Sequence, residues 1–219
     1  MEIICPVKKC VWGPINTLDD LMNYIAKSGQ FFGQDLSGPA CDFNASYPCN
    51  QTLYQYMGWG PHKGLDIPCV GGTEIYASHD GTVWKTSETI SQGLGVVLLS
   101  TDEKFQTVYW HNQKNLVKPG DKVKVGQLIA YSDNTGFSKG NHLHFEQKVW
   151  NGSQYKAIDP IPNFVFSKNM TEQDVKHLYA LAFYRLPDAT ESSYWVGKDL
   201  ATFLKTAIDD RAKFLQNEL

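Results

Sequence analysis

The chain has 219 residues, a formal net charge of −3 at pH 7, 42% hydrophobic residues and 20% charged residues. A chain of this length can bury one good hydrophobic core, with room for a small appendage. The sequence contains no basic run, which argues against a nucleic-acid-binding protein, and no apolar stretch of roughly 18 residues that could form a membrane-spanning helix. The composition is that of an ordinary folded globular protein.

Residues 1–28 are expected to form a leader segment attached to the main domain. Residues 17–25 carry apolar side chains at helical spacing, and Thr17 is a suitable N-cap for this helix. The first ten residues do not place a basic segment before an apolar one, so they do not have the pattern of a secretory signal.

All cysteines of the chain lie in its first third, at positions Cys5, Cys10, Cys41, Cys49 and Cys69. An odd count leaves at least one of them unpaired within a monomer. Short separations make Cys5–Cys10 and Cys41–Cys49 the candidate disulfides in an oxidising setting, with free buried thiols as the alternative. No C-x-x-C spacing supports a thiolate metal site.

The central part of the chain predicts a loop followed by a β-rich domain. Residues 36–55 are rich in Ser, Gly, Pro, Asn and Tyr, which predicts a loop that leads directly to His62 and forms one wall of a groove. Short runs of Val, Ile, Leu and Tyr then alternate with Gly and Asp turns, which predicts a mainly β domain built as an antiparallel sandwich or barrel. The expected strands cover residues 74–77, 81–85, 95–100, 106–111, 122–125, 127–131 and 142–149.

The last part of the chain, residues 163–219, changes to helical patterns. Residues 171–174 begin a helix with an acidic first turn, which suits the positive end of a helix dipole. Residues 191–197 and 199–217 predict two more helices, the last with a clear apolar stripe. We expect a small C-terminal α-helical module that packs on its neighbours, with glycan binding and oligomerisation as alternative roles.

The stretch of residues 141–146 combines a strand pattern with reactive side chains. It reads Asn-His-Leu-His-Phe-Glu, and in a β-strand successive side chains point to opposite faces. His142, His144 and Glu146 would then share one face, while the two apolar residues between them would face a core.

A second motif lies upstream, where Asp66 follows His62 by four residues. Pro61 and Gly64 disfavour a helix there, so the pair is expected on a strand or an extended turn that faces the later histidines. A catalytic zinc takes three protein ligands and leaves one position for water. His62, Asp66 and one histidine of the later pair match that count.

Taken in order, these motifs resemble the lysostaphin-type zinc metalloendopeptidases, which cut peptide bonds in bacterial peptidoglycan. That family has an early H-x-x-x-D motif, a lone histidine after a central strand and a late H-x-H motif. This chain matches it with His62 and Asp66, with His111, and with His142 and His144.

The resemblance covers residues 30–160, and residues 30–34 resemble the first strand of the family's domain. Further matching stretches lie at residues 81–83, 93–98, 117–120, 126–127 and 135–136. The expected organisation is therefore a leader over residues 1–28, a peptidase domain over residues 29–162 and a helical module over residues 163–219.

The resemblance implies one Zn²⁺ per chain, held by His62, Asp66 and His144. A zinc ion polarises the scissile carbonyl and lowers the pKa of a bound water from about 15.7 toward about 7. His111 and His142 match the family's catalytic histidines, one acting as the base and the other stabilising the oxyanion. The sequence does not say which of them takes which role.

Three neighbouring residues bear on the shape of this site. Glu146 either orients His144 through a hydrogen bond or is a solvated carboxylate at the edge of the sheet. Trp110 and Asn112 flank the central histidine where many members of the family have a small residue and a leucine. This departure bears on the shape of the groove and on the cross-bridge that it accepts. His79 and His177 match no ligand position and are expected on the surface.

The resemblance implies a zinc-dependent endopeptidase that acts on the stem or cross-bridge of peptidoglycan, as a lysin or in wall remodelling. Such an enzyme works at the cell wall, in an extracellular, periplasmic or virion-associated setting, and the missing signal is compatible with phage-type release or with a signal that has been removed. The first alternative is a non-catalytic wall-binding or activator protein on the same fold. The second is a biotin- or lipoyl-carrier module, since residues 117–128 resemble half of one, but no Met-Lys hairpin is present.

Overall fold

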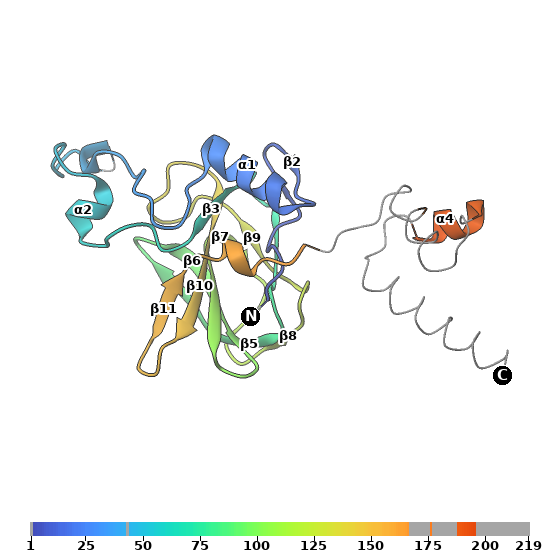
Figure 1. Cartoon of the computed structure of the whole chain (residues 1–219). Coiled ribbons are helices and arrows are strands. Elements are labelled where there is room, and N and C mark those ends of the chain that lie inside the picture. The colour runs from blue at the N-terminus through green and yellow to red at the C-terminus, as the bar shows by residue number, and fades with distance from the viewer. Residues whose placement is uncertain (1, 43, 167–175, 177–187, 196–219) are drawn as a thin grey trace. The chain divides into compact units, whose positions relative to one another are not determined.

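The computed structural model describes residues 2–42, 44–166, 176 and 188–195 (Figure 1). The chain divides into two compact units, Met1–Phe166 and Ser167–Leu219. Among the described residues, no helix has the length and apolar character needed to cross a membrane.

In the second unit the structure describes helix α4, Ala189–Trp195, which agrees with the helix predicted for residues 191–197. The other two helices predicted in this part of the chain, and His177, lie outside the described residues. The three-segment division predicted from the sequence stays a prediction.

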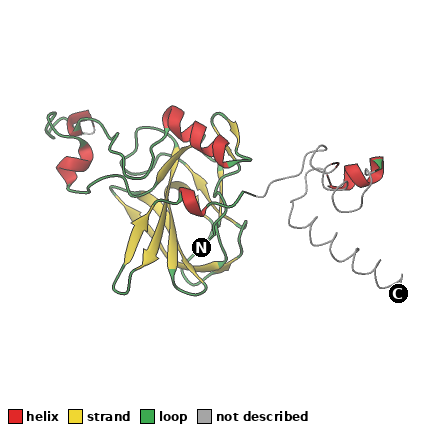
Figure 2. Cartoon of the chain, viewed as in Figure 1, coloured by secondary structure: helices red, strands yellow, loops and turns green. Residues whose placement is uncertain are grey.

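Antiparallel strands dominate the first unit (Figure 2). Its main sheet has nine strands, six of them in the order β11-β10-β7-β6-β5-β8, while β3 pairs with β10, and β9 pairs with β4 and β7. The bounds are β3 Leu65–Pro68, β4 Glu74–Tyr76, β5 Gly81–Thr89, β6 Gly93–Ser100, β7 Phe105–Asn115, β8 Lys122–Val123, β9 Leu128–Ser132, β10 His142–Trp150 and β11 Tyr155–Ile158. The mainly β fold predicted from the sequence is confirmed.

Strand β10 has the two-faced character that its alternating sequence predicts. Leu143 and Phe145 are fully buried in the hydrophobic core. Strand β3 lies antiparallel to β10 and places Ile67 opposite Leu143 and Leu65 opposite Phe145. These cross-strand apolar pairs fix the register, because a slip of one residue would move the apolar side chains to the other face. The two histidines of β10 therefore point away from the core.

The N-terminal segment contributes to the same core. It contains a short hairpin of β1 (Lys9–Cys10) and β2 (Gly13–Pro14), followed by helix α1, Leu18–Ser28. Thr17 is the N-cap of α1, as predicted: its hydroxyl accepts a hydrogen bond from the backbone N–H of Asp20 at 3.1 Å. On the inner face of α1, Leu21 and Ile25 are fully buried against the sheet.

The segment between α1 and β3 differs from its prediction. Residues 30–34 do not form a strand; within them Gln30 makes only an isolated bridge, to Asp66. The predicted loop contains a 3-10 turn, η1 (Ala40–Asp42), and helix α2, Leu53–Met57. A capping box between Thr52 and Gln55 begins α2, and this Thr-x-x-Gln signature is visible in the sequence.

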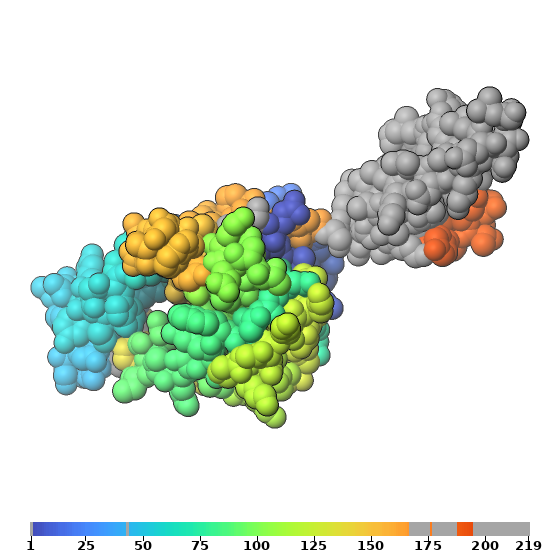
Figure 3. Space-filling view, turned by 90° about the horizontal axis from the view of Figure 1, so that it is seen from below, coloured from blue at the N-terminus to red at the C-terminus, as the bar shows by residue number. Residues whose placement is uncertain are grey.

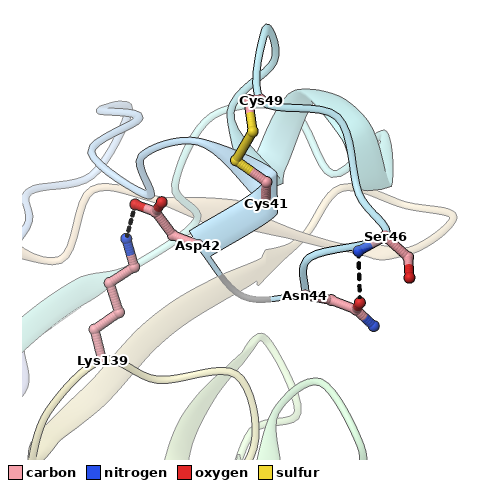
Figure 4. Close-up of a disulfide and its surroundings, with 6 residues drawn as sticks. All are labelled: Cys41, Asp42, Asn44, Ser46, Cys49 and Lys139. Carbon is pink, nitrogen blue, oxygen red and sulfur yellow. Dashed lines mark hydrogen bonds and ion pairs between the residues drawn. A yellow bond between two sulfur atoms is a disulfide. The ribbon is translucent and has the colours of Figure 1, made fainter.

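The cysteines follow one of the two predicted pairings. A disulfide joins Cys41 to Cys49 (Figure 4). Cys5, Cys10 and Cys69 are free, so the predicted Cys5–Cys10 disulfide is wrong. Cys10 is buried in the hydrophobic core and Cys5 packs against it partly buried, so both thiols serve as small apolar side chains, and burial raises the pKa of Cys5 to about 12.

Candidate metal centre

The pairing of β3 with β10 brings two of the predicted ligands together. In this register Asp66 lies directly opposite His144, so both side chains stand on the same face of the sheet. His62 lies in the turn just before β3. Its backbone N–H donates to the carbonyl of Gln34, and its own carbonyl accepts from the N–H of Gly33, both at 2.8 Å. These bonds hold His62 over the two strands.

The three side chains converge on one point. The distance from His62 Nε2 is 3.1 Å to Asp66 Oδ1 and 3.0 Å to His144 Nδ1. His144 Nδ1 lies 2.9 Å from Asp66 Oδ1. Among the described residues, these three form the group whose ligand atoms lie close enough together to hold a metal ion.

Hydrogen bonds behind the two imidazoles determine which nitrogens face the centre. His62 Nδ1 lies 3.1 Å from the carbonyl oxygen of Phe31 and must donate its proton to it. His144 Nε2 lies 3.1 Å from Glu146 Oε1 and donates to that carboxylate. In the neutral rings, the opposite nitrogens therefore present lone pairs toward Asp66. Two lone pairs and a carboxylate oxygen meet at one point, which is a donor set that zinc prefers.

The charges around this point also favour a cation. Burial alone would raise the pKa of Asp66, but the facing His142, His144 and His62 outweigh burial and hold it well below its usual range. Burial would lower the pKa of His144, but Asp66 and Glu146 outweigh it and raise this pKa to about 9. The position between the carboxylates thus stabilises positive charge, whether a proton or a metal ion supplies it.

Glu146 is buried, with 5% of its surface exposed, so it is not the solvated carboxylate of the alternative interpretation. It lies between His144 and Lys148, whose Nζ is 2.7 Å from Glu146 Oε2. Burial would raise the pKa of Glu146, but these two partners outweigh it and lower the pKa to about 2. Glu146 therefore stays ionised and keeps accepting the hydrogen bond from His144.

His111 reaches the centre from β7 through an irregular backbone. Its φ of 63° lies in the left-handed region, which residues other than glycine rarely adopt. The ladder between β7 and β9 shifts register just beyond it, and its N–H and carbonyl bond to the backbones of Gln92 and Asp133. The ring centroid of His111 lies 4.5 Å from that of His142 and 6.0 Å from that of His144.

The two remaining histidines, His111 and His142, are also oriented by hydrogen bonds from one ring nitrogen. His111 Nδ1 donates to the carbonyl of Thr135 at 2.6 Å, and His142 Nδ1 donates to the carbonyl of Gly140 at 2.8 Å. His142 Nε2 lies 3.4 Å from Asp66 Oδ1. Burial lowers the pKa of His111, and the nearby His142 and His144 add to this effect, so that the pKa falls to about 3. The neutral His111 ring therefore has a lone pair on Nε2.

The centre lies along a groove formed by two adjoining pockets. His111, His144, Tyr54 and Phe137 line both of them. The first pocket continues past Trp59, Lys63 and Trp110, and the second continues past Leu36, Leu53 and Asn141. A groove that is open on both sides of the centre suits an extended chain better than a small enclosed ligand.

The segment before β3 forms one wall of this groove, as predicted. Cys41 and Cys49 close its loop, and Asp42 pairs at 3.3 Å with Lys139, which lines the second pocket (Figure 4). Figure 3 shows this segment in cyan as a separate lobe beside the green strands of the sheet. Tyr54 of α2, which sequence reasoning missed, stacks near His62 with ring centroids 6.1 Å apart. The capping box that begins α2 was the signal that could have placed it.

The prediction that His79 lies on the surface is wrong. It is buried, with its ring edge against Phe105, and its Nε2 lies 3.0 Å from the hydroxyl of Thr107. Its Nδ1 donates to the carbonyl of Asp80 at 2.8 Å. A turn position does not reveal burial, because neighbouring strands can cover a turn.

Comparison with known proteins agrees with this geometry. Residues 60–160 match the model of Peptidase family M23. The chain is 32% identical to the glycyl-glycine endopeptidase ALE-1 of Staphylococcus capitis over 150 residues, 66% of this chain and 41% of the relative. It is 38% identical to the peptidoglycan DD-endopeptidase ShyA of Vibrio cholerae over 114 residues, 51% of this chain and 26% of the relative. The chain thus spans less than half the length of either relative.

Among solved structures, the catalytic domain of lysostaphin from Staphylococcus simulans aligns with a TM-score of 0.49 and 28% identity. That alignment covers 68% of this chain and 97% of the lysostaphin domain. The family match spans His62, Asp66, His111, His142 and His144. The chain therefore carries a Peptidase family M23 domain over residues 60–160.

Proposed function

We propose that the chain is a zinc-dependent endopeptidase that hydrolyses peptide bonds in the stem or cross-bridge of bacterial peptidoglycan. The observation that carries this proposal is the convergence of His62, Asp66 and His144 beside His111 and His142. The M23 domain and the similarity to the peptidoglycan DD-endopeptidase ShyA support the same substrate class, and the similarity to the glycyl-glycine endopeptidase ALE-1 supports peptide-bond cleavage. The site of action is then the bacterial cell wall.

One zinc ion per chain would be held by His62 Nε2, Asp66 Oδ1 and His144 Nδ1. When bound, zinc supplies a Lewis acid for the scissile carbonyl and acidifies a water molecule. Phe31 and Glu146 hold the two imidazoles in the tautomers that this donor set requires.

His111 and His142 would handle the protons of the reaction. Each ring donates from Nδ1 to a backbone carbonyl, so the neutral form can accept a proton at Nε2 and the protonated form can donate from Nε2. One of them takes the proton of the attacking water. The other donates a hydrogen bond to the oxygen that becomes negatively charged when the carbonyl turns tetrahedral.

The groove would orient the substrate. Its open ends accept a peptide that continues in both directions from the cleaved bond, as a cross-linked peptide of peptidoglycan does. Tyr54, Phe137 and Trp110 supply apolar walls on either side of the centre. Residues 29–162 would form the complete peptidase domain, since Phe31 and Tyr54 lie outside the matched range but contact His62.

Release of dye from labelled peptidoglycan tests this function. The zinc-loaded chain should release dye, while a chelated sample and the His144→Ala variant should not. His111→Ala and His142→Ala should each lower the rate by about 10²–10⁴-fold and keep their zinc. Stoichiometric zinc without release from several wall chemistries would overturn the enzymatic proposal and leave a wall-binding protein.

A further inference from the structure

We propose that Lys63 binds a carboxylate of the substrate beside the cleaved bond. The preferred substrate would then be a peptidoglycan stem peptide with a free carboxylate at that point, and an uncharged oligoglycine bridge would be a poor one. This inference rests on the proposed endopeptidase function and concerns the specificity of the same site.

Lys63 is placed next to the centre by its neighbours in the chain. It follows His62 directly, and the backbone of His62 is bonded to that of Gln34 and Gly33. On its other side, Gly64 lies so close to β10 that a Cβ atom there would come 2.4 Å from the carbonyl oxygen of Phe145. The Cα atom of Lys63 is thus fixed between two tightly held residues, and its ammonium group stays within one side-chain length of the site.

The ammonium group of Lys63 has no ion-pair partner among the described residues, although it is exposed and lines the first pocket. Two other lysines near the groove are paired. Lys148 is 2.7 Å from Glu146, and Lys139 is 3.3 Å from Asp42.

The nearby carboxylates already have partners within the protein. Asp66 faces the histidines of the centre, and Glu146 is shared by His144 and Lys148. Among the described residues that line the first pocket, Lys63 is the one lysine or arginine, and the histidine with a raised pKa, His144, is held by Asp66 and Glu146. In the second pocket the lining lysine, Lys139, is already paired with Asp42. The groove is asymmetric, with its available positive charge on the side of the first pocket.

The walls of this pocket strengthen such a pair. Trp59, Trp110 and Phe137 line it together with Lys63. These aromatic walls limit the access of water from their side while Lys63 itself stays exposed, so an ion pair there is somewhat stronger than one on an open surface. A charge-assisted hydrogen bond in this setting corresponds to roughly a tenfold preference for the charged substrate.

Two groups of a stem peptide supply this chemistry: the free carboxylate of a diaminopimelate residue and the terminal carboxylate of the chain. Both groups are carboxylates, so each is anionic and presents two oxygen atoms to a lysine. Amidation neutralises either of them with little change in size, so amidated peptides separate the two sources.

The experiment compares three cross-linked stem peptides and pentaglycine. One peptide is unmodified, one is amidated on diaminopimelate and one is amidated at its terminus. The zinc-loaded full chain is assayed as wild type, Lys63→Met, Lys63→Arg and Lys122→Met. Lys122 is an exposed lysine of β8 that lines neither pocket, so its replacement is a control for the change in net charge.

We expect the wild type to cut the unmodified peptide with a kcat/KM about tenfold above that of one amidated form, and to cut pentaglycine poorly. The amidation that matters identifies the carboxylate. Lys63→Met should lose this preference through a higher KM for the unmodified peptide, and Lys63→Arg should keep most of it. Lys122→Met should behave as the wild type.

Equal cutting of all peptides by the wild type would overturn the role of Lys63, and so would an unchanged preference in Lys63→Met. Both results would leave the endopeptidase function standing. If no substrate is cut, the proposed function fails, and calorimetric binding of the same peptides decides the role of Lys63 separately. Equal affinity for the unmodified and amidated peptides would then overturn it.

Discussion

At the scale of single residues, the candidate centre depends on hydrogen bonds behind the ligands. His62 and His144 can each bind a metal through either ring nitrogen, and their partners select one. The carbonyl of Phe31 accepts a hydrogen bond from the first ring, and the carboxylate of Glu146 accepts one from the second. A site arranged in this way loses no free energy to tautomer exchange when the metal binds.

The first prediction concerns Glu146, which is ionised and paired with Lys148. In Glu146→Gln the amide can still accept from His144, but its negative charge is lost. We expect the zinc affinity to fall by about 10–100-fold, measured by competition with a chromophoric chelator. Glu88→Gln, on an exposed part of β5, is the matched control and should leave the affinity unchanged. An affinity equal to that of the wild type in Glu146→Gln would refute the positioning role.

At the scale of elements, the sheet and α1 share one core. Leu21 and Ile25 of α1 lie in the same buried cluster as Leu65 and Ile67 of β3, and β3 carries Asp66. The N-terminal helix therefore supports the strand that holds a candidate ligand.

The second prediction tests this support with two neighbouring residues of α1. Leu21 is fully buried and Met22 is 39% exposed. Leu21→Ala should lower the free energy of unfolding by about 2–5 kcal/mol, because it leaves a cavity in the core. Met22→Ala should change it by less than about 1 kcal/mol. Equal effects in urea denaturation would mean that α1 does not pack on the sheet as described.

The third prediction concerns the turn between β4 and β5. Burial lowers the pKa of His79 below its ordinary value of 6.5, so the folded protein holds this ring neutral. The unfolded chain binds the proton more readily, and the stabilising contribution is present above about pH 6.5 and lost as the pH falls through the lower, folded pKa. Between pH 7.5 and pH 5 the wild type should therefore lose more free energy of unfolding than His79→Gln. Parallel losses would show that His79 does not contribute.

At the scale of the whole molecule, local patterns of the sequence predicted which side chains lie together better than they predicted the segments around them. The spacing of His62, Asp66, His111, His142 and His144 is visible in the sequence, and strand alternation places the last two on one face. Such local patterns are readable because both the period of a strand and the ligand preferences of zinc are fixed.

What the sequence did not reveal depends on how the chain is routed in space. The bond from His62 to Phe31 joins residues 31 positions apart, and the burial of His79 comes from strands that follow it. The backbone of His111 is also set by its partners on other segments. Helix α2 does not depend on distant segments in this way, since the capping box of Thr52 and Gln55 that begins it is visible in the sequence.

The matched family domain is therefore only part of the working unit. Residues 60–160 contain the five histidine and aspartate positions, while Phe31 and Tyr54 contact His62 from outside that range and α1 packs on the core beneath β3. We therefore expect Met1–Phe166 to unfold as one cooperative unit, with a single centre in a groove that residues inside and outside the matched range line.

The most direct test is a zinc titration of the metal-free chain on purified peptidoglycan, with new amines and new reducing ends counted together. A zinc-dependent endopeptidase should release amines in proportion to zinc up to one equivalent per chain and leave reducing ends constant, and His144→Ala should produce neither. An increase in reducing ends, or amines released at an equal rate without zinc, would contradict a zinc-dependent endopeptidase.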